Sequence, residues 1–369
     1  KVRLREDGLR AVLCCLYSGK DFMNILNHNA RIIIGIDHGY GNIKTANCCF
    51  RTGVASFDKE PTFKSNLLIY GGHYYLIGEE HKEFTADKMA DSDYYILTLA
   101  AIGRELNIRK QPSARIHLAA GLPLTWVSEQ KDAFKKYLLQ RESADFTFRG
   151  VNYHVDFVGA DIFPQCFGAV ADHLRDFRGV NMLADIGNGT MNVMYINDRR
   201  PQEKKCFTEK YGTHQCMLAV RENLLKQFGT ATDETIIDQV LRHGTAEISE
   251  RYLSAIQEIA KEYVSGIFRR LREHEYDPEL MKLYVVGGGG CLVKNFGEFE
   301  SGRVIINDDI CATAKGYEYL ARLRAKKGGI VSASSAPISD SIWRRRQTGR
   351  RGSIFNSGIS GNTALTAKR

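Results

Sequence analysis

Two glycine-rich turns, one in each half of the chain, follow a run of apolar residues and carry an aspartate. The first reads Gly35-Ile-Asp-His-Gly-Tyr-Gly-Asn-Ile-Lys44, and the second reads Asp185-Ile-Gly-Asn-Gly-Thr-Met-Asn192. Glycine lets backbone N–H groups approach phosphate oxygens, and an aspartate beside them can hold a hydrated Mg²⁺. Each turn alone is about as typical of an ordinary β-hairpin as of a phosphate-binding loop. The pair, at the starts of two similar halves, indicates a nucleotide clamped between two domains.

Side chains near these turns fit the same chemistry. Lys44 lies on the expected return strand, where a cation can reach a β- or γ-phosphate. The turn lacks the P-loop pattern Gly-x-x-x-x-Gly-Lys-Ser/Thr, and the strand expected after it excludes a Rossmann turn. Thr190 and the amides of the second turn can bind a γ-phosphate, with Asp185 on Mg²⁺ through water.

Three other features are further candidates. Gln165 is expected in the first turn of a helix, where it can orient a water for in-line attack, and Asp161 is the rival base. Four consecutive glycines, Gly287–Gly290, let the backbone lie against a base or ribose, or else form a flexible loop. A final set of charged residues fits an adenosine pocket or ordinary surface positions: Glu209, Lys210 and Glu222.

Hydrophobic periodicity predicts strands and helices arranged in two halves that open alike. Strands are expected at residues 32–36, 43–50, 53–57, 65–70, 73–77, 114–120, 146–149, 151–157, 180–185, 193–197 and 283–286. Helices are expected at residues 94–107, 129–140, 163–177, 215–227, 233–241, 249–274 and 310–326.

Composition narrows the class of protein. The 369 residues are enough for two domains with sizeable cores. The net charge of +8 comes from the C-terminal tail, since Arg324–Arg369 holds ten basic residues and one acid, Asp340. The folded body is therefore not expected to bind nucleic acid directly. The nine cysteines form no Cys-x-x-Cys pair, which favours a reduced, cytoplasmic protein, and no apolar run is long enough for a membrane span.

The ordered set of three motifs, ending in Val285-Val-Gly-Gly-Gly289, resembles the superfamily of actins, sugar kinases and heat-shock chaperones. The first turn together with Phe163-Pro-Gln-Cys166 is most similar to the plasmid-segregation actins, the ParM/StbA group. The resemblance implies an α/β protein with two actin-like (ribonuclease H-like) domains around an interdomain nucleotide cleft. It also implies that ATP and Mg²⁺ bind there, that ATP drives polymerisation into filaments, and that hydrolysis destabilises them.

The resemblance also implies roles at matching positions. Asp37 and Asp185 would hold Mg²⁺, through water, and act in catalysis together with Gln165, which would position the attacking water. Contacts with the nucleotide would come from Gly39, Tyr40, Gly41, Lys44, Gly187, Asn188, Gly189 and Thr190, with Gly287, Gly288 and Gly289 facing adenosine. Asn188 and Asn192 depart from the commoner Gly and Asp of the second loop.

On this reading, residues 1–30 are an N-terminal extension, 31–178 form domain I, 179–327 form domain II, and 328–369 are a disordered basic tail. The last expected helix, at 310–326, belongs to domain II in sequence, and its packing on domain I is left open. The expected partners are further copies of the chain and a DNA-binding adaptor protein. Two alternatives stay open: a small-molecule kinase of the same superfamily, with Asp161 as base, and a non-filamentous ATP-binding regulatory module.

Overall fold

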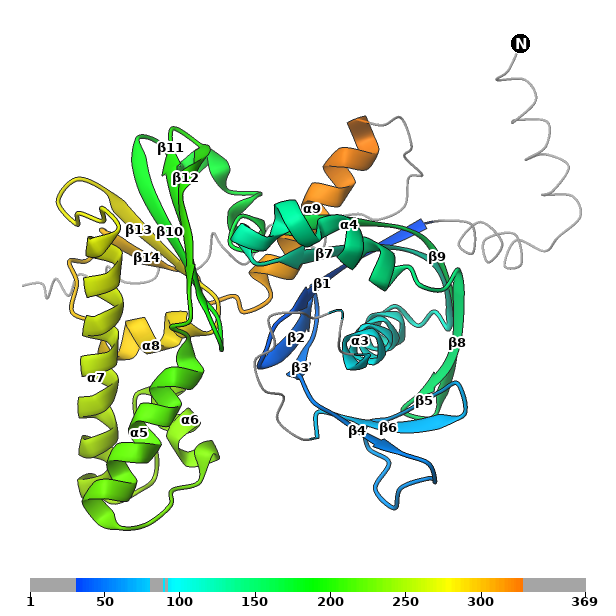
Figure 1. The fold of residues 1–369 in the computed structure, drawn as a ribbon, viewed down its shortest axis with the longest axis horizontal. Coiled ribbons are helices and arrows are strands. Elements are labelled where there is room, and N and C mark those ends of the chain that lie inside the picture. Colours follow the sequence, from blue (N-terminus) through cyan, green and yellow to red (C-terminus); the bar gives the residue numbers. More distant parts are fainter. Residues whose placement is uncertain (1–30, 80–88, 90–91, 328–369) are drawn as a thin grey trace, which may run out of the picture. The chain divides into compact units, whose positions relative to one another are not determined.

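The first half of the chain is built around one curved sheet (Figure 1). A computed structural model describes residues 31–79, 89 and 92–327, so the expected extension and tail lie outside the described residues. Along the sheet the strands run β3-β2-β1-β7-β9-β8-β5-β6-β4. Their bounds are β1 Arg31–His38, β2 Asn42–Thr45, β3 Cys49–Arg51, β4 Val54–Phe57, β5 Leu67–Tyr70, β6 His73–Ile77, β7 Ser113–Leu122, β8 Ser143–Phe148 and β9 Val151–Pro164.

Parallel pairing places three strand ends together. β7 pairs in parallel with β1 on one side and with β9 on the other, whereas β2 returns antiparallel to β1. The carboxyl ends of β1, β7 and β9 therefore meet at one edge of the sheet, which is where parallel sheets bind ligands.

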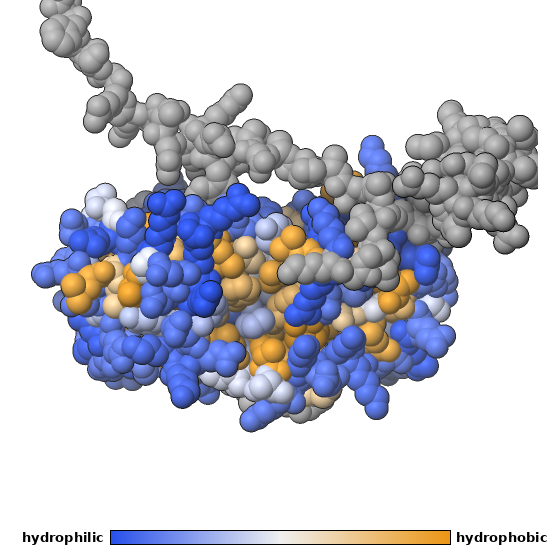
Figure 2. All heavy atoms as spheres, turned by 90° about the horizontal axis from the view of Figure 1, so that it is seen from above, coloured by the Kyte–Doolittle hydropathy of each residue, from blue (hydrophilic) through white to orange (hydrophobic). Residues whose placement is uncertain are grey.

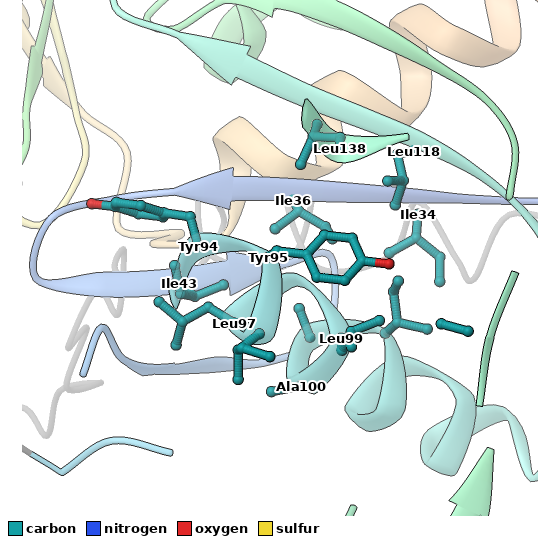
Figure 3. Close-up of a cluster of buried hydrophobic side chains, with 14 of the residues drawn as sticks. Ile34, Ile36, Ile43, Tyr94, Tyr95, Leu97, Leu99, Ala100, Leu118 and Leu138 are labelled. Atoms are coloured by element: carbon teal, nitrogen blue, oxygen red, sulfur yellow. The ribbon is translucent and has the colours of Figure 1, made fainter. Parts of the chain in front are cut away.

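Helix α3 (Asp93–Arg109) fills the concave side of this sheet (Figure 1). Most of its residues are buried, because strands surround it on several sides. Figure 3 shows its apolar side chains, among them Leu97 and Leu99, close to Ile34, Ile36 and Leu118 of the sheet. The short 3-10 turn η1 (Leu124–Trp126) and helix α4 (Val127–Leu138) follow β7, and α4 adds Leu138 to the same core.

The second half has its own sheet, in the order β12-β11-β10-β13-β14. Its strands are β10 Val180–Ile186, β11 Met191–Asn197, β12 Arg200–Glu209, β13 Lys282–Val286 and β14 Val304–Ile306. β10, β13 and β14 run parallel, and β11 returns antiparallel to β10 just as β2 returns to β1. The helices of this half are α5 Thr213–Phe228, α6 Glu234–His243, α7 Glu250–Glu273 and α8 Gly289–Phe296.

Helix α9 (Ala312–Lys327) follows the second sheet in sequence but packs against β1 and β7 of the first. The approach is very close, since a Cβ added at Gly35 would overlap the carbonyl oxygen of Ala314. The buried Glu318 carboxylate accepts a hydrogen bond from the Gly35 N–H at 3.2 Å. The last described helix is thus fixed to the strand that leads into the first glycine-rich turn.

The helix expected at 163–177 is wrong. β9 continues to Pro164, because Phe163 and Pro164 pair with Gly121 and Leu122 of β7. The chain then turns through Cys166 at φ 72° and forms only two 3-10 turns, η2 (Gly168–Val170) and η3 (Leu174–Asp176). Strands β12 and β14 and helix α8 were not expected.

The surface mixes hydrophilic and hydrophobic residues. On the face seen in Figure 2 hydrophilic residues predominate, with hydrophobic residues exposed between them. Among the residues that the structure describes, no helix is long and apolar enough to cross a membrane.

Candidate functional site

The two aspartates of the glycine-rich turns lie near one another, with Lys44 close to both. The Lys44 ammonium contacts Asp37 Oδ2 at 3.1 Å, and the two residues are cross-strand neighbours on β2 and β1. The Gln165 side-chain amide donates to Asp37 Oδ1 at 3.2 Å. Asp185 Oδ2 accepts a hydrogen bond from the Cys166 backbone N–H at 3.2 Å. The turn at 165–166 thus contacts both carboxylates.

Burial and mutual repulsion change the acidity of these groups. Burial, and then the negative charge of Asp37, raises the pKa of Asp185 to about 6. Burial acts to lower the pKa of Lys44, but the charges of Asp37 and Asp185 outweigh it and hold that pKa above its ordinary value. Lys44 therefore stays protonated, and its positive charge offsets the repulsion between the two buried carboxylates.

The first loop is held through its carbonyl groups. The Thr52 hydroxyl donates to the Gly39 carbonyl at 2.8 Å, and the Thr52 N–H donates to the Gly41 carbonyl at 3.1 Å. Both oxygens are tied to the protein, and no hydrogen bond within the described residues uses the Gly41 N–H. This amide is therefore left for an anion.

The second loop is held in the same way by the first turn of α5. The N–H groups of Thr213 and His214 donate to the carbonyls of Gly187 and Asn188, at 3.0 and 2.9 Å. Across residues 31–79 and 92–327, neither the Gly189 N–H nor the Thr190 N–H enters a hydrogen bond. The two loops also touch, because a Cβ at Gly41 would lie 2.6 Å from Asn188 Cγ. Together they form one surface of free amides.

A cavity of about 410 Å³ opens at this surface, a size typical of small-molecule sites. It brings together the predicted residues Asp37, Gly39, Tyr40, Gly41, Lys44, Gln165, Asp185, Gly187, Asn188, Gly189, Thr190 and Gly288. Asn192 also lines it, and its amide oxygen accepts a hydrogen bond from the Thr208 hydroxyl at 2.8 Å. Since Asn192 is the cross-strand neighbour of Asp185, this position supplies a neutral amide where an acid would add a third negative charge.

Sequence reasoning missed one wall of the cavity. Apolar side chains from three helices and the segment before α9 line it, namely Met217, Leu241, Leu292 and Ile310. Beside them lies an ion pair on α6, where Arg242 Nε contacts Asp238 Oδ2 at 2.6 Å. Nothing in the sequence marks these positions, because which face of α6 meets the cavity depends on how the helices pack.

The glycine run after β13 lies differently from the expected loop. Helix α8 begins at Gly289, and only Gly288 of the proposed adenosine contacts lines the cavity. A Cβ at Gly287 would lie 2.6 Å from Asp185 Oδ1, and one at Gly289 would overlap the Ile186 side chain. These two glycines let α8 pack closely against the end of β10.

Four charged candidates lie away from the cavity. Asp161 accepts hydrogen bonds from His117 and Arg324 at 3.0 and 3.1 Å, and these partners lower its pKa to about 2. Because Asp161 lies outside the cavity lining and is engaged by His117 and Arg324, the structure does not favour its rival role as the base. The cavity lining also omits Glu209, Lys210 and Glu222; Glu209 pairs with Arg270, and Glu222 pairs with Lys226.

Comparison with known proteins agrees with the fold. The model of the actin-like protein N-terminal domain matches residues 35–168, and that of the archaeal actin homologue MreB-like C-terminal domain matches residues 183–298. The chain belongs to the actin-like proteins. Its two α/β lobes match those of ParM and of archaeal actin homologues. A search of curated proteins finds no match.

Several solved structures share this fold. The archaeal actin homolog Ta0583 superposes with a TM-score of 0.66 at 20% identity, covering 79% of this chain and 99% of that one, and its ADP complex with 0.63. The apo pSK41 ParM gives 0.62 at 16% identity, with coverage of 80% and 98%. A 15-stranded ParM filament from Clostridium botulinum gives 0.62 at 18% identity, with coverage of 79% and 99%.

The raised pKa of Asp185 predicts a pH-dependent stability. Its ionised form is disfavoured in the folded state, so the stability that this group confers is fully present below about pH 4 and is lost as the pH rises through about 6. Asp185→Asn should therefore raise the stability of the ligand-free protein at pH 7.5, by on the order of 1–3 kcal/mol, and by about half as much at pH 5. Thermal denaturation in EDTA at both pH values measures this. The exposed Asp58→Asn is the control, and an Asp185→Asn variant no more stable at pH 7.5 would contradict the assignment.

Proposed function

We propose that this protein is an ATPase that binds ATP with Mg²⁺ in the 410 Å³ cavity and polymerises into filaments. One observation carries the proposal. Lys44, which contacts Asp37 and is affected by the charge of Asp185, lines the cavity together with two loops whose carbonyl groups are hydrogen-bonded to the protein. This arrangement suits a polyphosphate, because free N–H groups and one cation can meet its oxygens together.

The cavity divides into parts suited to different regions of a nucleotide. The glycine loops suit the phosphates, whereas the apolar wall of Met217, Leu241 and Leu292 suits the flat faces of a base. Gly288, which has no atom within 4 Å of a Cβ position, leaves room beside that wall. The ADP complex of Ta0583 supports a nucleotide as the ligand of this fold.

The donor set fits Mg²⁺ better than a cation held by protein alone. No cluster of three His, Cys, Asp or Glu side chains suited to a metal is found in the described part of the chain. Mg²⁺ usually keeps several waters and binds one or two carboxylates together with substrate phosphates. Asp37 and Asp185 are the residues that would hold it. When bound, the ion would neutralise charge on the phosphates.

Gln165 is the residue we assign to the attacking water. Its side chain lines the cavity, and its amide nitrogen donates to Asp37, which leaves the amide oxygen as an acceptor for a water proton. Asp37 thereby orients the amide, and the Lys44 ammonium contacts the same carboxylate. With Asp161 engaged by His117 and Arg324, the small-molecule kinase loses the only base proposed for it.

We place the filament in the cytoplasm and assign it a role in plasmid or other DNA segregation through a DNA-binding adaptor protein. The free cysteines among the described residues support the first point, and the likeness to ParM supports the second. A head-to-tail contact between identical subunits that does not close into a ring produces such a polymer.

Polymerisation is tested by light scattering, sedimentation and electron microscopy with ATP, ADP and a non-hydrolysable ATP analogue. The proposal predicts sedimentable filaments with Mg²⁺ and ATP. With the non-hydrolysable analogue it predicts filaments that last longer. Absence of polymer at every protein concentration tried, with nucleotide bound, would reject the filament while leaving the ATPase intact.

Thr52→Val should weaken nucleotide binding. The substitution keeps the shape but removes the hydroxyl that holds the Gly39 carbonyl, so the first loop loses an anchor. Loss of such a buried hydrogen bond costs about 1–1.5 kcal/mol, so the Kd of Mg·ATP should rise roughly tenfold. Isothermal titration calorimetry measures it, with Thr147→Val on the exposed β8–β9 hairpin as control. An unchanged Kd would show that Thr52 does not shape the loop.

Gln165→Ala should slow hydrolysis while leaving binding and polymerisation in place. The variant removes the group that orients water but keeps Lys44, both aspartates and the loop amides. We expect kcat to fall by about 10²-fold, the usual size of such an effect, with the Kd of Mg·ATP within threefold of wild type. Phosphate release and titration calorimetry measure the two quantities. Hydrolysis at the wild-type rate would remove Gln165 from the mechanism.

A further inference from the structure

The Tyr317 hydroxyl on α9 is buried and has no hydrogen-bond partner among the described residues. Its side chain is fully buried, with 0% exposed. Leaving a buried polar group unpaired costs about 1–3 kcal/mol, and phenylalanine would fill the same space without that cost. The oxygen therefore calls for an explanation beyond packing.

The strand register places this hydroxyl beside the candidate site. β1 and β7 pair through Ile36 and Ala120, so the next residue of β7, Gly121, lies beside Asp37. A Cβ at Gly121 would overlap the Tyr317 hydroxyl oxygen. Gly121 is also the partner of Phe163 on β9, two residues before Gln165. The hydroxyl thus lies at the strand ends that carry Asp37 and Gln165.

Tyr317 and Asp37 also share one face of the sheet. The Cβ direction at Gly35 points at Ala314 of α9, and Asp37, two residues further along β1, projects to the same side. Tyr317 follows Ala314 by three residues, so it lies about one helical turn away on a neighbouring part of the same helix surface.

Close packing fixes the ring in this position. A Cβ at Gly168 would lie 2.6 Å from Tyr317 Cε1, and the ring stacks on Phe163 with centroids 6.0 Å apart. The hydroxyl is therefore held where it is. Burial, together with the charges of Asp37 and Asp185, raises the pKa of Tyr317 well above its ordinary value. The group stays protonated and can donate a hydrogen bond.

We propose that Tyr317 is a positioning residue for hydrolysis, whose hydroxyl donates a hydrogen bond through a bound water to the Asp37 carboxylate. A carboxylate has about four acceptor positions, so it can accept this hydrogen bond in addition to those from Lys44 and Gln165. Asp37 is then held from three elements: β2, the turn after β9, and α9. This inference rests on the proposed ATPase function.

Tyr317→Phe tests it, because the change removes a single oxygen. We expect the kcat of ATP hydrolysis to fall about tenfold, with the Kd of Mg·ATP within threefold of wild type and the Tm unchanged or higher. If Tyr317 acts through Asp37 and Gln165, the losses in Tyr317→Phe and Gln165→Ala should not add in the double variant. Tyr95→Phe, which removes a buried hydroxyl from the α3 core, is the matched control and should leave kcat unchanged.

The outcomes separate this inference from the function on which it rests. A Tyr317→Phe variant with kcat within twofold of wild type, or with additive losses in the double variant, would overturn the positioning role alone. No hydrolysis by the wild-type protein in the same assay would reject the ATPase function and, with it, this role. A fall in kcat accompanied by a large fall in Tm would show a structural role, and would also overturn the proposal.

Discussion

Two carboxylates from opposite halves of the chain share the charge of one largely buried lysine, and the rest of the site is arranged around that contact. Asp37 and Asp185 end parallel strands of separate sheets, and Lys44 reaches them from the strand that returns beside Asp37. An unpaired buried charge costs several kcal/mol, so removing the lysine would leave two carboxylates without compensation. Burial, and then the charge of Asp37, still raises the pKa of Asp185, so the lysine offsets these effects only in part in the ligand-free protein. A bound cation would complete the compensation.

The two glycine-rich loops are held in orientation by the same kind of hydrogen bond. In each loop the carbonyl groups are bonded to the protein, by Thr52 in the first and by the first turn of α5 in the second. Because a peptide group is planar, the tied Asn188 carbonyl fixes the Gly189 N–H on its opposite side, and the tied carbonyls of Gly39 and Gly41 restrict the peptide group between them, which carries the Gly41 N–H. The loops can therefore present amides to an anion before any ligand arrives, which reduces the ordering cost of binding. Helix α9 holds β1, the strand that leads into the first loop, because it packs on the β1 backbone at Gly35.

Much of this could be predicted from sequence, where local pattern and physical role coincide. The aspartates, the loop glycines and Lys44 stand at the ends of clearly apolar strands, and all of them line the cavity. The helix expected at 163–177 failed because pairing of Phe163 and Pro164 with β7, a long-range contact, overrides local helical periodicity. The wall formed by α5, α6 and α8 has no sequence signal, because helix rotation decides which residues face the cavity. Gly287 and Gly289 are predicted to face adenosine, and the sequence does not indicate their close packing against Asp185 and Ile186. The role inferred for Tyr317 has no sequence signal for a similar reason, since only the long-range packing of α9 on β1 and β7 brings this residue to the strand ends near Asp37.

The central claim is that both loops and the shared lysine form one nucleotide site. Isothermal titration calorimetry of the wild-type chain and of Lys44→Ala, each with Mg·ATP at pH 7.5, tests it most directly. The account predicts one Mg²⁺-dependent site per wild-type chain and a loss of affinity of at least about 10²-fold in Lys44→Ala, because a charge-assisted contact to phosphate and the compensation of both aspartates disappear together. Equal affinity in the two proteins, or no binding by the wild-type chain, would contradict it.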